Sequence, residues 1–397
     1  MKHFKRLFLV LACFTLILCA GCKTETAYYF YTNVPSDGFE IADKNFVLGG
    51  IIEGYTPPEV EYPEEDVSNY TTMGYRFTAM LTDINLNVSY DFSKEGEKSR
   101  FSEFCRKIVD EMKRFDNAIS TAVTYSDINK FNTAAAGDTI EITRTGYEIL
   151  EIAKNLYSET EGYYNPALYY NIQAYGFGAA QAYPEKLSDL PKDEDVAKYT
   201  DLANHFADLK TECREVETAN GNTEKKFYVT KPAYTVEVGG ETLSMKIDLG
   251  GIGKGYAVDR AEEIFDEYGY NYGYFNFGFS SMMFKSFVNG GSYTVAFKNP
   301  RTLANDYYFT TPVRNTKLST SGDNNQFYII DGTRYCHIID PTTGKPVHTG
   351  IMSVSVVGGS AAEDDAYTTA IMAMGKEKAQ EFIKDKLSDR KVVFTCE

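Results

Sequence analysis

Residues 245–260 read Met-Lys-Ile-Asp-Leu-Gly-Gly-Ile-Gly-Lys-Gly-Tyr-Ala-Val-Asp-Arg. An apolar approach ends at Asp248, and four glycines then surround a single cation, Lys254. An amphipathic run follows, and Gly269 stands where it would end a helix. Its apolar side chains at helical spacing are Ala257, Ala261, Ile264, Phe265 and Tyr268. The pattern predicts a strand, a glycine-rich turn and a helix, in which bare backbone can approach a phosphate at the helix N-terminus.

Two phosphate-binding motifs do not match this stretch. A P-loop needs Ser or Thr directly after its lysine, but Gly255 follows Lys254. The dinucleotide fingerprint needs a glycine three places after Gly253, where Tyr256 stands. The alternative interpretation is a tight strand-to-helix turn that needs glycine only for its own geometry.

Working outward, the chain alternates helical patterns with short strands. Partial alternation over 73–90 predicts a strand pair, and apolar stripes predict helices over 101–119, 149–156 and 193–209. Short strands are separated by turn signals at 239–240, 289–291, 331–332 and 341–344, and two helices are expected near 363–374 and 376–387. Helices interleaved with hairpins, rather than regular βαβ units, predict an α+β fold with mixed or antiparallel sheets and packed helices.

The N-terminus has the composition of an export signal. Three basic residues precede an apolar run over 7–18, and Cys19-Ala-Gly-Cys22 follows. This ending resembles the lipobox of bacterial lipoproteins, so we expect a lipoprotein signal peptide over 1–21 and lipidation of Cys22. The alternatives are an ordinary cleaved signal or an uncleaved anchor. The acidic, Tyr- and Pro-rich residues 22–70 then form a tether, and residues 71–397 form the domain, held outside the cytoplasm at the bacterial cell membrane.

The net charge restricts the partners. The chain carries a formal charge of -16, and removal of the signal takes away three further positive charges. This argues against binding to nucleic acid or to an anionic bilayer surface. An acidic protein that handles a phosphate compound needs a cation between the two.

A candidate metal site lies at the start of the helix expected near 363. Asp365 and Thr369 are spaced i, i+4, so a carboxylate and a hydroxyl share one helical face. With neighbouring backbone carbonyls, they are ligands that suit Mg²⁺ and not zinc. The alternative is that acidic residues stand here because helix N-termini favour negative charge.

His337 is a candidate general base. It follows a predicted strand and precedes the turn at 341–344, where a side chain can reach a cleft. An imidazole can deprotonate a hydroxyl near neutral pH. The alternative is a structural histidine. In the same way, the aromatic segments 162–166 and 175–178 either stack on a flat ligand ring or pack in the core.

Together these clusters resemble, in order, the ApbE family of FAD:protein FMN transferases. The similar segments are Met73-Gly74, residues 120–132, residues 162–166 with Tyr175-Gly-Phe177, residues 248–259, Ser321-Gly-Asp323, residues 337–341 and Asp365-Ala-Tyr-Thr-Thr-Ala370. The resemblance runs from about residue 70 to the C-terminus, and it implies an ApbE-like fold with tandem T-fold-like halves.

The resemblance also implies an activity and a set of site residues. Enzymes of this family use Mg²⁺ to transfer FMN from FAD to a Thr or Ser hydroxyl of an acceptor protein through a phosphoester bond, releasing AMP. The implied metal ligands are Asp365 and Thr369 with the backbone carbonyls of Gly251 and Thr368. The implied FAD contacts are Met73, Tyr163, Tyr164, Asn165, Asp248, Lys254 and His337, and the implied catalytic residues are His337 and Asp365.

Some positions depart from the family pattern. Ala122 stands where many members have Tyr, and Asn165 replaces an Asp. Two alternatives therefore remain beside the transferase: an Mg²⁺-dependent FAD pyrophosphatase that yields FMN and AMP, and a flavin-binding lipoprotein without turnover. Because the chain contains no Asp/Ser-Gly-x-Thr/Ser acceptor pattern, we expect the acceptor to be a separate protein.

Overall fold

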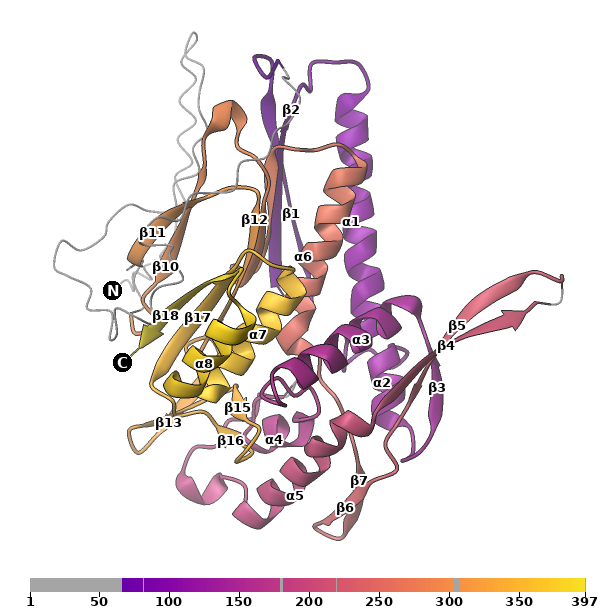
Figure 1. The fold of residues 1–397 in the computed structure, drawn as a ribbon, viewed down its shortest axis with the longest axis vertical. Coiled ribbons are helices and arrows are strands. Elements are labelled where there is room, and N and C mark those ends of the chain that lie inside the picture. The colour runs from indigo at the N-terminus through magenta and orange to yellow at the C-terminus, as the bar shows by residue number, and fades with distance from the viewer. Residues whose placement is uncertain (1–65, 81, 179–180, 219, 303–306, 397) are drawn as a thin grey trace, which may run out of the picture.

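A seven-stranded antiparallel sheet forms the centre of the fold (Figure 1). The computed structural model describes residues 66–80, 82–178, 181–218, 220–302 and 307–396. In spatial order the strands are β1 (Thr71–Ala79), β2 (Thr82–Tyr90), β8 (Gly273–Phe277), β9 (Ser281–Phe284), β12 (Thr316–Gly322), β17 (Ile351–Val357) and β18 (Lys391–Cys396). Strands that are distant in sequence are therefore neighbours in the sheet. Because β8, β9, β12 and β17 are consecutive neighbours, their ends lie side by side.

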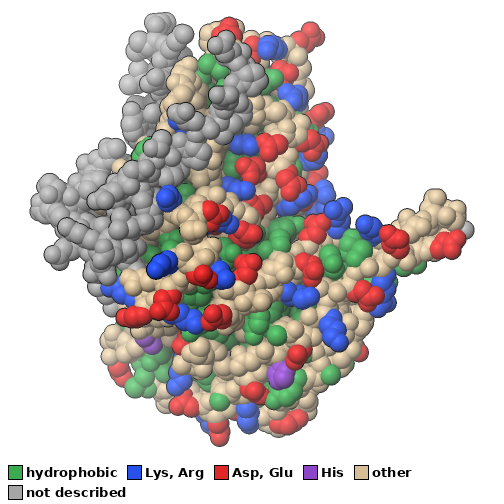
Figure 2. Space-filling view, in the orientation of Figure 1, with side chains coloured by type: hydrophobic (Ala, Val, Ile, Leu, Met, Phe, Trp, Pro, Cys, Tyr) green, Lys and Arg blue, Asp and Glu red, His purple; other side chains and the backbone are tan. Residues whose placement is uncertain are grey.

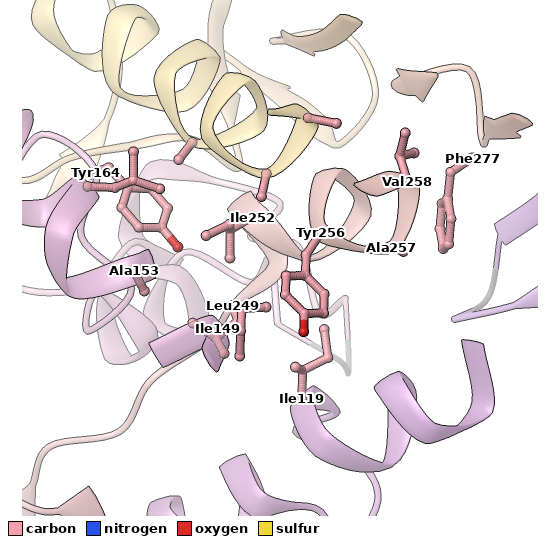
Figure 3. Close-up of a cluster of buried hydrophobic side chains, with 14 of the residues drawn as sticks. Ile119, Ile149, Ala153, Tyr164, Leu249, Ile252, Tyr256, Ala257, Val258 and Phe277 are labelled. Carbon is pink, nitrogen blue, oxygen red and sulfur yellow. The ribbon is translucent and has the colours of Figure 1, made fainter. Parts of the chain in front are cut away.

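Helices cover one face of this sheet. They are α1 (Glu97–Ile119), α6 (Gly250–Glu267), α7 (Ala361–Met374) and α8 (Lys376–Lys386). The stripe predicted in α1 is buried, because side chains three and four apart share one helical face. Figure 3 shows Leu249, Ile252 and Tyr256 at the start of α6 packed among Ile119 of α1 and Ile149 of α3. This contact places the start of α6 inside the main core.

The opposite face of the sheet carries a smaller core. Hairpin β10 (Tyr293–Lys298) and β11 (Tyr307–Val313) covers it. Val295 and Phe297 of the hairpin pack with Leu318 of β12, while the neighbouring Ser319 faces α7. The two cores follow from the period-two alternation of β12.

The remaining elements lie outside the central sheet. They are α2 (Asp127–Thr133), α3 (Arg144–Glu159), α4 (Tyr169–Ala174), α5 (Asp193–Asn204), the 3₁₀ helices η1 (Leu187–Asp189), η2 (His205–Asp208) and η3 (Val288–Gly290), β3 (Thr139–Ile142), β4 (Lys210–Glu217), β5 (Thr223–Thr230), β6 (Thr235–Val238), β7 (Glu241–Ser244), β13 (Phe327–Ile330), β14 (Thr333–Cys336), β15 (Ile339–Asp340) and β16 (Lys345–Pro346). Hairpin β4–β5 projects from the body (Figure 1).

Most predicted elements are confirmed, including the strand pair, the helices and the α+β class. The turn signals at Gly239-Gly240, Asp331-Gly332 and Gly344 close the hairpins β6–β7, β13–β14 and β15–β16. The signal peptide, Cys22 and the tether up to residue 65 lie outside the described residues, and the tandem halves stay a prediction. In the described part of the chain, no helix has the length and apolar character needed to cross a bilayer.

The predicted strand and glycine turn before α6 are wrong. Residues 245–249 form no strand, because the Asn132 side chain satisfies the Ile247 backbone that a neighbouring strand would otherwise pair. Asn132 Nδ2 donates to Ile247 O at 2.9 Å, and Ile247 N donates to Asn132 Oδ1 at 2.8 Å. The four glycines belong to α6 itself, which begins at Gly250.

Gly255 is required by a helix contact rather than by a turn. A Cβ on Gly255 would lie 1.9 Å from the Ala361 carbonyl oxygen at the start of α7. One on Gly253 would meet only the flexible end of Ile119, at 2.9 Å. Glycine at 255 therefore lets the backbones of α6 and α7 approach each other, despite its cost within a helix.

On the face shown in Figure 2, basic and acidic side chains are interspersed. This face presents no continuous basic surface, consistent with the charge of -16. On this face, acidic and basic side chains thus form a mixed charged surface.

Gly255→Ala should lower the free energy of unfolding by about 3 kcal/mol or more, because backbone must move to admit the methyl group. Gly253→Ala is the matched control in the same helix. Gain in helix propensity offsets a small shift of Ile119, so its effect should stay within about 1 kcal/mol. Urea unfolding of both variants measures the difference, and equal effects would contradict the close contact.

Candidate active site

The site is built where α6 and α7 cross. Asp365 lies one turn into α7 and is 2% exposed. Its Oδ2 accepts a hydrogen bond from the Gly255 N–H of α6 at 3.1 Å. Burial raises the pKa of the Asp365 carboxyl, and the positive charge of Lys254 acts in the opposite direction. A buried carboxylate held only by backbone donors and a nearby lysine favours a further cation.

The neighbouring acidic side chains of α7 have other partners. Asp364 accepts from Gly359 N and from Arg390 Nε, each at 3.1 Å. Glu363 also pairs with Arg390. The structure therefore selects Asp365 from the run Glu363-Asp364-Asp365 as the carboxylate that faces α6.

Two threonine hydroxyls lie beside Asp365. Thr369 Oγ1 donates to the Asp365 carbonyl at 3.3 Å, so its lone pairs remain available to a ligand. A Cβ added to Gly251 would lie 3.4 Å from Thr369 Oγ1, which places these two predicted metal ligands side by side. Thr368 is fully buried, and its hydroxyl bonds to Ser321 Oγ of β12 at 2.7 Å. Gly251 and Thr368 both lie inside helices, so their carbonyls have only a second lone pair to offer.

Tyr164 and Asp248 form a second side of the site. The Tyr164 hydroxyl is buried and finds no hydrogen-bond partner among the described residues. Burial, together with the charges of Asp365 and Asp248, raises the Tyr164 pKa well above its ordinary value. Asp248 Oδ1 accepts from Gly250 N at 2.7 Å, and the Asp248 N–H donates to Pro166 O at 2.8 Å. These bonds join the segment around Tyr164 to the start of α6. The unpaired hydroxyl of Tyr164 indicates a place for a ligand.

Lys254 is the positive charge shared by these groups. Its Nζ lies 3.4 Å from the Gly250 carbonyl, within the first turn of α6. Burial raises the pKa of Asp248 and of Asp365, and the charge of Lys254 acts to lower both. The same charge also lowers the pKa of His337. The structure therefore brings His337 and Asp365, which are distant in sequence, close to the segment that contains Asp248 and Lys254.

His337 directly follows β14, as predicted, and is partly buried. Its Nδ1 lies 3.3 Å from the Gln326 carbonyl, and the ring meets Phe177 at an angle of 65°. Burial, with help from the charge of Lys254, lowers the His337 pKa to about 4. The imidazole is therefore neutral at physiological pH and has a nitrogen lone pair to accept a proton.

Two predicted FAD contacts, Asn165 and Tyr163, also have partners within the protein. Asn165 Oδ1 accepts from Ala167 N at 2.9 Å, and its Nδ2 donates to Ala203 O at 3.3 Å. The Tyr163 ring lies 5.0 Å below the Lys378 ammonium group. Asn165 thus shapes the loop that carries Tyr164, and in the 175–178 segment Phe177 stacks on Tyr328.

Met73 is not brought to the site, and Met80 stands there in its place. Met73 pairs with Val88 in the middle of β1, seven residues and roughly 23 Å along the strand from Met80. The Met80 methyl group lies 3.7 Å from the position of a Cβ on Gly253. Met80 lies between β1 and β2, within the range 73–90 that the sequence predicted as a strand pair.

These residues fit a hard divalent cation. Nowhere in the described ranges do three His, Cys, Asp or Glu side chains gather as a metal site. Beside Asp365, the oxygens available to a metal include those of Thr369 and Gly251. One carboxylate with neutral oxygens is the donor set of Mg²⁺, which keeps water and substrate phosphate as its remaining ligands.

The fold and site define a class: an α+β protein whose two crossing helices place one carboxylate, one lysine and open backbone around a buried ligand site. The ApbE family model matches residues 75–394. The chain belongs to the ApbE family. The match begins after Met73 and includes Met80, in agreement with the geometry.

Curated relatives and solved structures share this fold. FAD:protein FMN transferase of Escherichia coli strain K12 is 23% identical over 288 residues, covering 72% of this chain and 76% of that protein. The protein of that name from Treponema pallidum is 26% identical over 270 residues, covering 66% and 68%. Flavin transferase ApbE from Vibrio cholerae superposes with a TM-score of 0.65 at 22% identity, covering 82% and 94%, and the apo flavinyl transferase ApbE of Pseudomonas stutzeri with 0.64 at 18%, covering 83% and 92%.

The buried imidazole predicts a pH effect on stability. Because the His337 pKa falls from 6.5 to about 4 in the folded chain, the unfolded chain binds more protons between these values. The stability contribution of neutral His337 is complete above pH 6.5 and is lost as pH falls toward 4. Relative to His337→Gln, the wild type should lose up to about 3 kcal/mol of unfolding free energy over this range. Urea unfolding at pH 7 and pH 4.5 measures both proteins. If the unfolding free energies of wild type and His337→Gln differ by the same amount at the two pH values, burial of the ring is contradicted.

Proposed function

We propose that this chain transfers FMN from FAD to a Thr or Ser hydroxyl of a separate acceptor protein, with Mg²⁺, and releases AMP. The coarser activity, a flavin transferase that uses FAD as its substrate and a protein as acceptor, follows from membership of the ApbE family. One observation supports the finer proposal most strongly. Asp365 and Thr369 of α7 meet Gly251 and Lys254 of α6, beside the neutral imidazole of His337.

The chain's own residues can hold the diphosphate. Lys254 supplies a positive charge at the first turn of α6, where helix N-terminal N–H groups also favour an anion. Bound at Asp365 and Thr369, Mg²⁺ would neutralise diphosphate charge and polarise its P–O bonds. The unpaired Tyr164 hydroxyl offers a hydrogen bond from the opposite side.

The transfer step exchanges one P–O bond for another. The acceptor hydroxyl oxygen attacks the FMN phosphorus, the bond to the AMP phosphate breaks, and AMP leaves. His337, neutral at physiological pH, takes the hydroxyl proton. Its low pKa makes it a weak base in the free protein, and the negative charge of bound FAD would raise its proton affinity.

We further propose that the domain works outside the cytoplasm, anchored through a lipid on Cys22. The support is the sequence alone: a basic start, an apolar run and small residues before that cysteine. The acidic residues 22–70 would then hold the domain away from the membrane surface.

Asp365→Asn should lower the rate of FMN transfer by about 100-fold or more, because it removes the buried carboxylate proposed to hold the metal with Gly251 and Thr369. The assay supplies FAD, Mg²⁺ and an acceptor domain with the Asp/Ser-Gly-x-Thr/Ser pattern, and mass spectrometry detects FMN on the acceptor. Glu363→Gln is the matched control in the same helix and should stay within about 3-fold of wild type.

The same assay separates the alternatives. FMN and AMP released without acceptor modification indicate a pyrophosphatase, and intact FAD retained on the protein indicates a binding protein. Either result with the wild type would contradict the transferase proposal, and an unchanged rate in Asp365→Asn would contradict the site.

Cys22→Ala should release the protein from the membrane fraction, because the thiol is the point of lipid attachment. Fractionation of cells that express wild type and variant, followed by immunoblotting, measures the distribution. A variant that remains in the membrane fraction would show that Cys22 is not the anchor.

A further inference from the structure

Helices α6 and α7 meet at three levels spaced one turn apart. Gly251, Gly255 and Asp259 follow one face of α6 at i, i+4 and i+8. The matching residues of α7 run in the opposite direction: Gly251 lies beside Thr369, Gly255 bonds to Asp365, and Asp259 contacts the N-terminus of the helix at Ala361. The first two levels contain the proposed metal ligands. The third level, the contact of Asp259 with Ala361, is not part of the proposed metal site.

Asp259 binds the N-terminus of α7 with both carboxylate oxygens. Oδ1 accepts from Ala361 N at 2.9 Å, and Oδ2 accepts from Ala362 N at 3.0 Å and from Ser360 Oγ at 2.6 Å. Ser360 is also the N-cap of α7, since its side chain accepts from Glu363 N. A carboxylate on one helix therefore satisfies the terminal N–H groups of another, where the helix dipole strengthens the bond.

Lys317 fixes the position of Asp259 from the sheet. Its Nζ lies 2.8 Å from Asp259 Oδ1 and 2.7 Å from Glu262 Oε2. Although burial alone would lower it, these two carboxylates raise the Lys317 pKa. Strand β12, which carries Lys317, also carries Ser321 against Thr368. The sheet, α6 and the start of α7 are thus joined at one carboxylate.

We propose that Asp259 is a positioning residue of the transfer reaction, setting the register of α7 on α6 so that Asp365 and Thr369 face Gly251. This inference rests on the proposed function of that site. A slip of α7 by one residue would move its side chains by about 1.5 Å along the axis and turn them by about 100°. Either change would separate the ligands, because metal coordination and reacting groups tolerate much smaller displacements.

The position of Asp259 indicates a role beyond capping α7. Ser360 already supplies the local N-cap, and a cap within α7 stabilises the helix wherever it packs. Asp259 instead joins this end of α7 to the helix that carries Gly251 and Lys254. Its loss should therefore weaken metal binding more than it weakens FAD binding.

The test compares Asp259→Asn and Asp259→Ala with Asp266→Asn. Asp266 lies on the same helix and pairs with Lys285, on the strand side rather than against α7. Mn²⁺ binding is measured by electron paramagnetic resonance with FAD present and acceptor absent, and FAD binding is measured without metal. The rate of FMN transfer is then followed against Mg²⁺ concentration.

Both Asp259 variants should raise the Kd for Mn²⁺ and the half-saturating Mg²⁺ concentration by at least about 10-fold. Their FAD affinity without metal should stay within about 3-fold, and Asp266→Asn should match the wild type in all three measurements. If the Asp259 variants fail to fold, Ser360→Ala removes one of the three donors that α7 and its N-cap supply to the same carboxylate, and it should raise the Kd for Mn²⁺ by about 3-fold or more.

An unchanged Kd for Mn²⁺ in the folded variants would overturn the proposal, even with a lower Tm, because Asp259 would then be a stabilising cap only. Equal weakening in Asp266→Asn would overturn it as well. The proposed function is judged separately, on FMN transfer by the wild type. If Mn²⁺ binding by the folded protein depends on Asp259 but the wild type transfers no FMN, the positioning role stands and the transferase proposal is overturned.

Discussion

The approach of two helix backbones at Gly255 is the constraint on which the site depends. With no side chain at this position, the Ala361 carbonyl can lie against α6, and the Gly255 N–H reaches the Asp365 carboxylate at 3.1 Å. Any larger residue would separate α6 from α7. The carboxylate would then lose a backbone donor and its place beside Thr369 and Gly251. The glycines that first suggested a phosphate turn thus act by packing two helices closely.

This packing resolves a problem of charge. The chain has a formal charge of -16, and FAD brings further negative charge to a site that already contains Asp248 and Asp365. Burial of the two carboxyl groups raises the pKa of each, and Lys254 only partly offsets this. A divalent cation shared by Asp365 and the diphosphate would convert repulsion into attraction. The metal proposal therefore follows from electrostatics as well as from family resemblance.

The sequence predicted the fold class and most of the site, because both depend on local patterns. Apolar periodicity found α1, α6 and α7, and residue type with spacing selected Lys254, His337, Asp365 and Thr369. The errors concern contacts between distant segments. No local pattern shows that the Asn132 side chain replaces a strand partner for Ile247, 115 positions away. Likewise, only the position of Met80 beside Gly253 of α6 distinguishes it from Met73.

The central claim is that the α6–α7 contact forms the metal and diphosphate site. Crystals of the protein grown with FAD and Mn²⁺ test it most directly through the anomalous scattering of manganese. The account predicts one strong peak about 2.1–2.2 Å from an Asp365 carboxylate oxygen and from Thr369 Oγ1, with the FAD diphosphate between this peak and Lys254. A peak elsewhere, or a diphosphate bound away from α6, would contradict it.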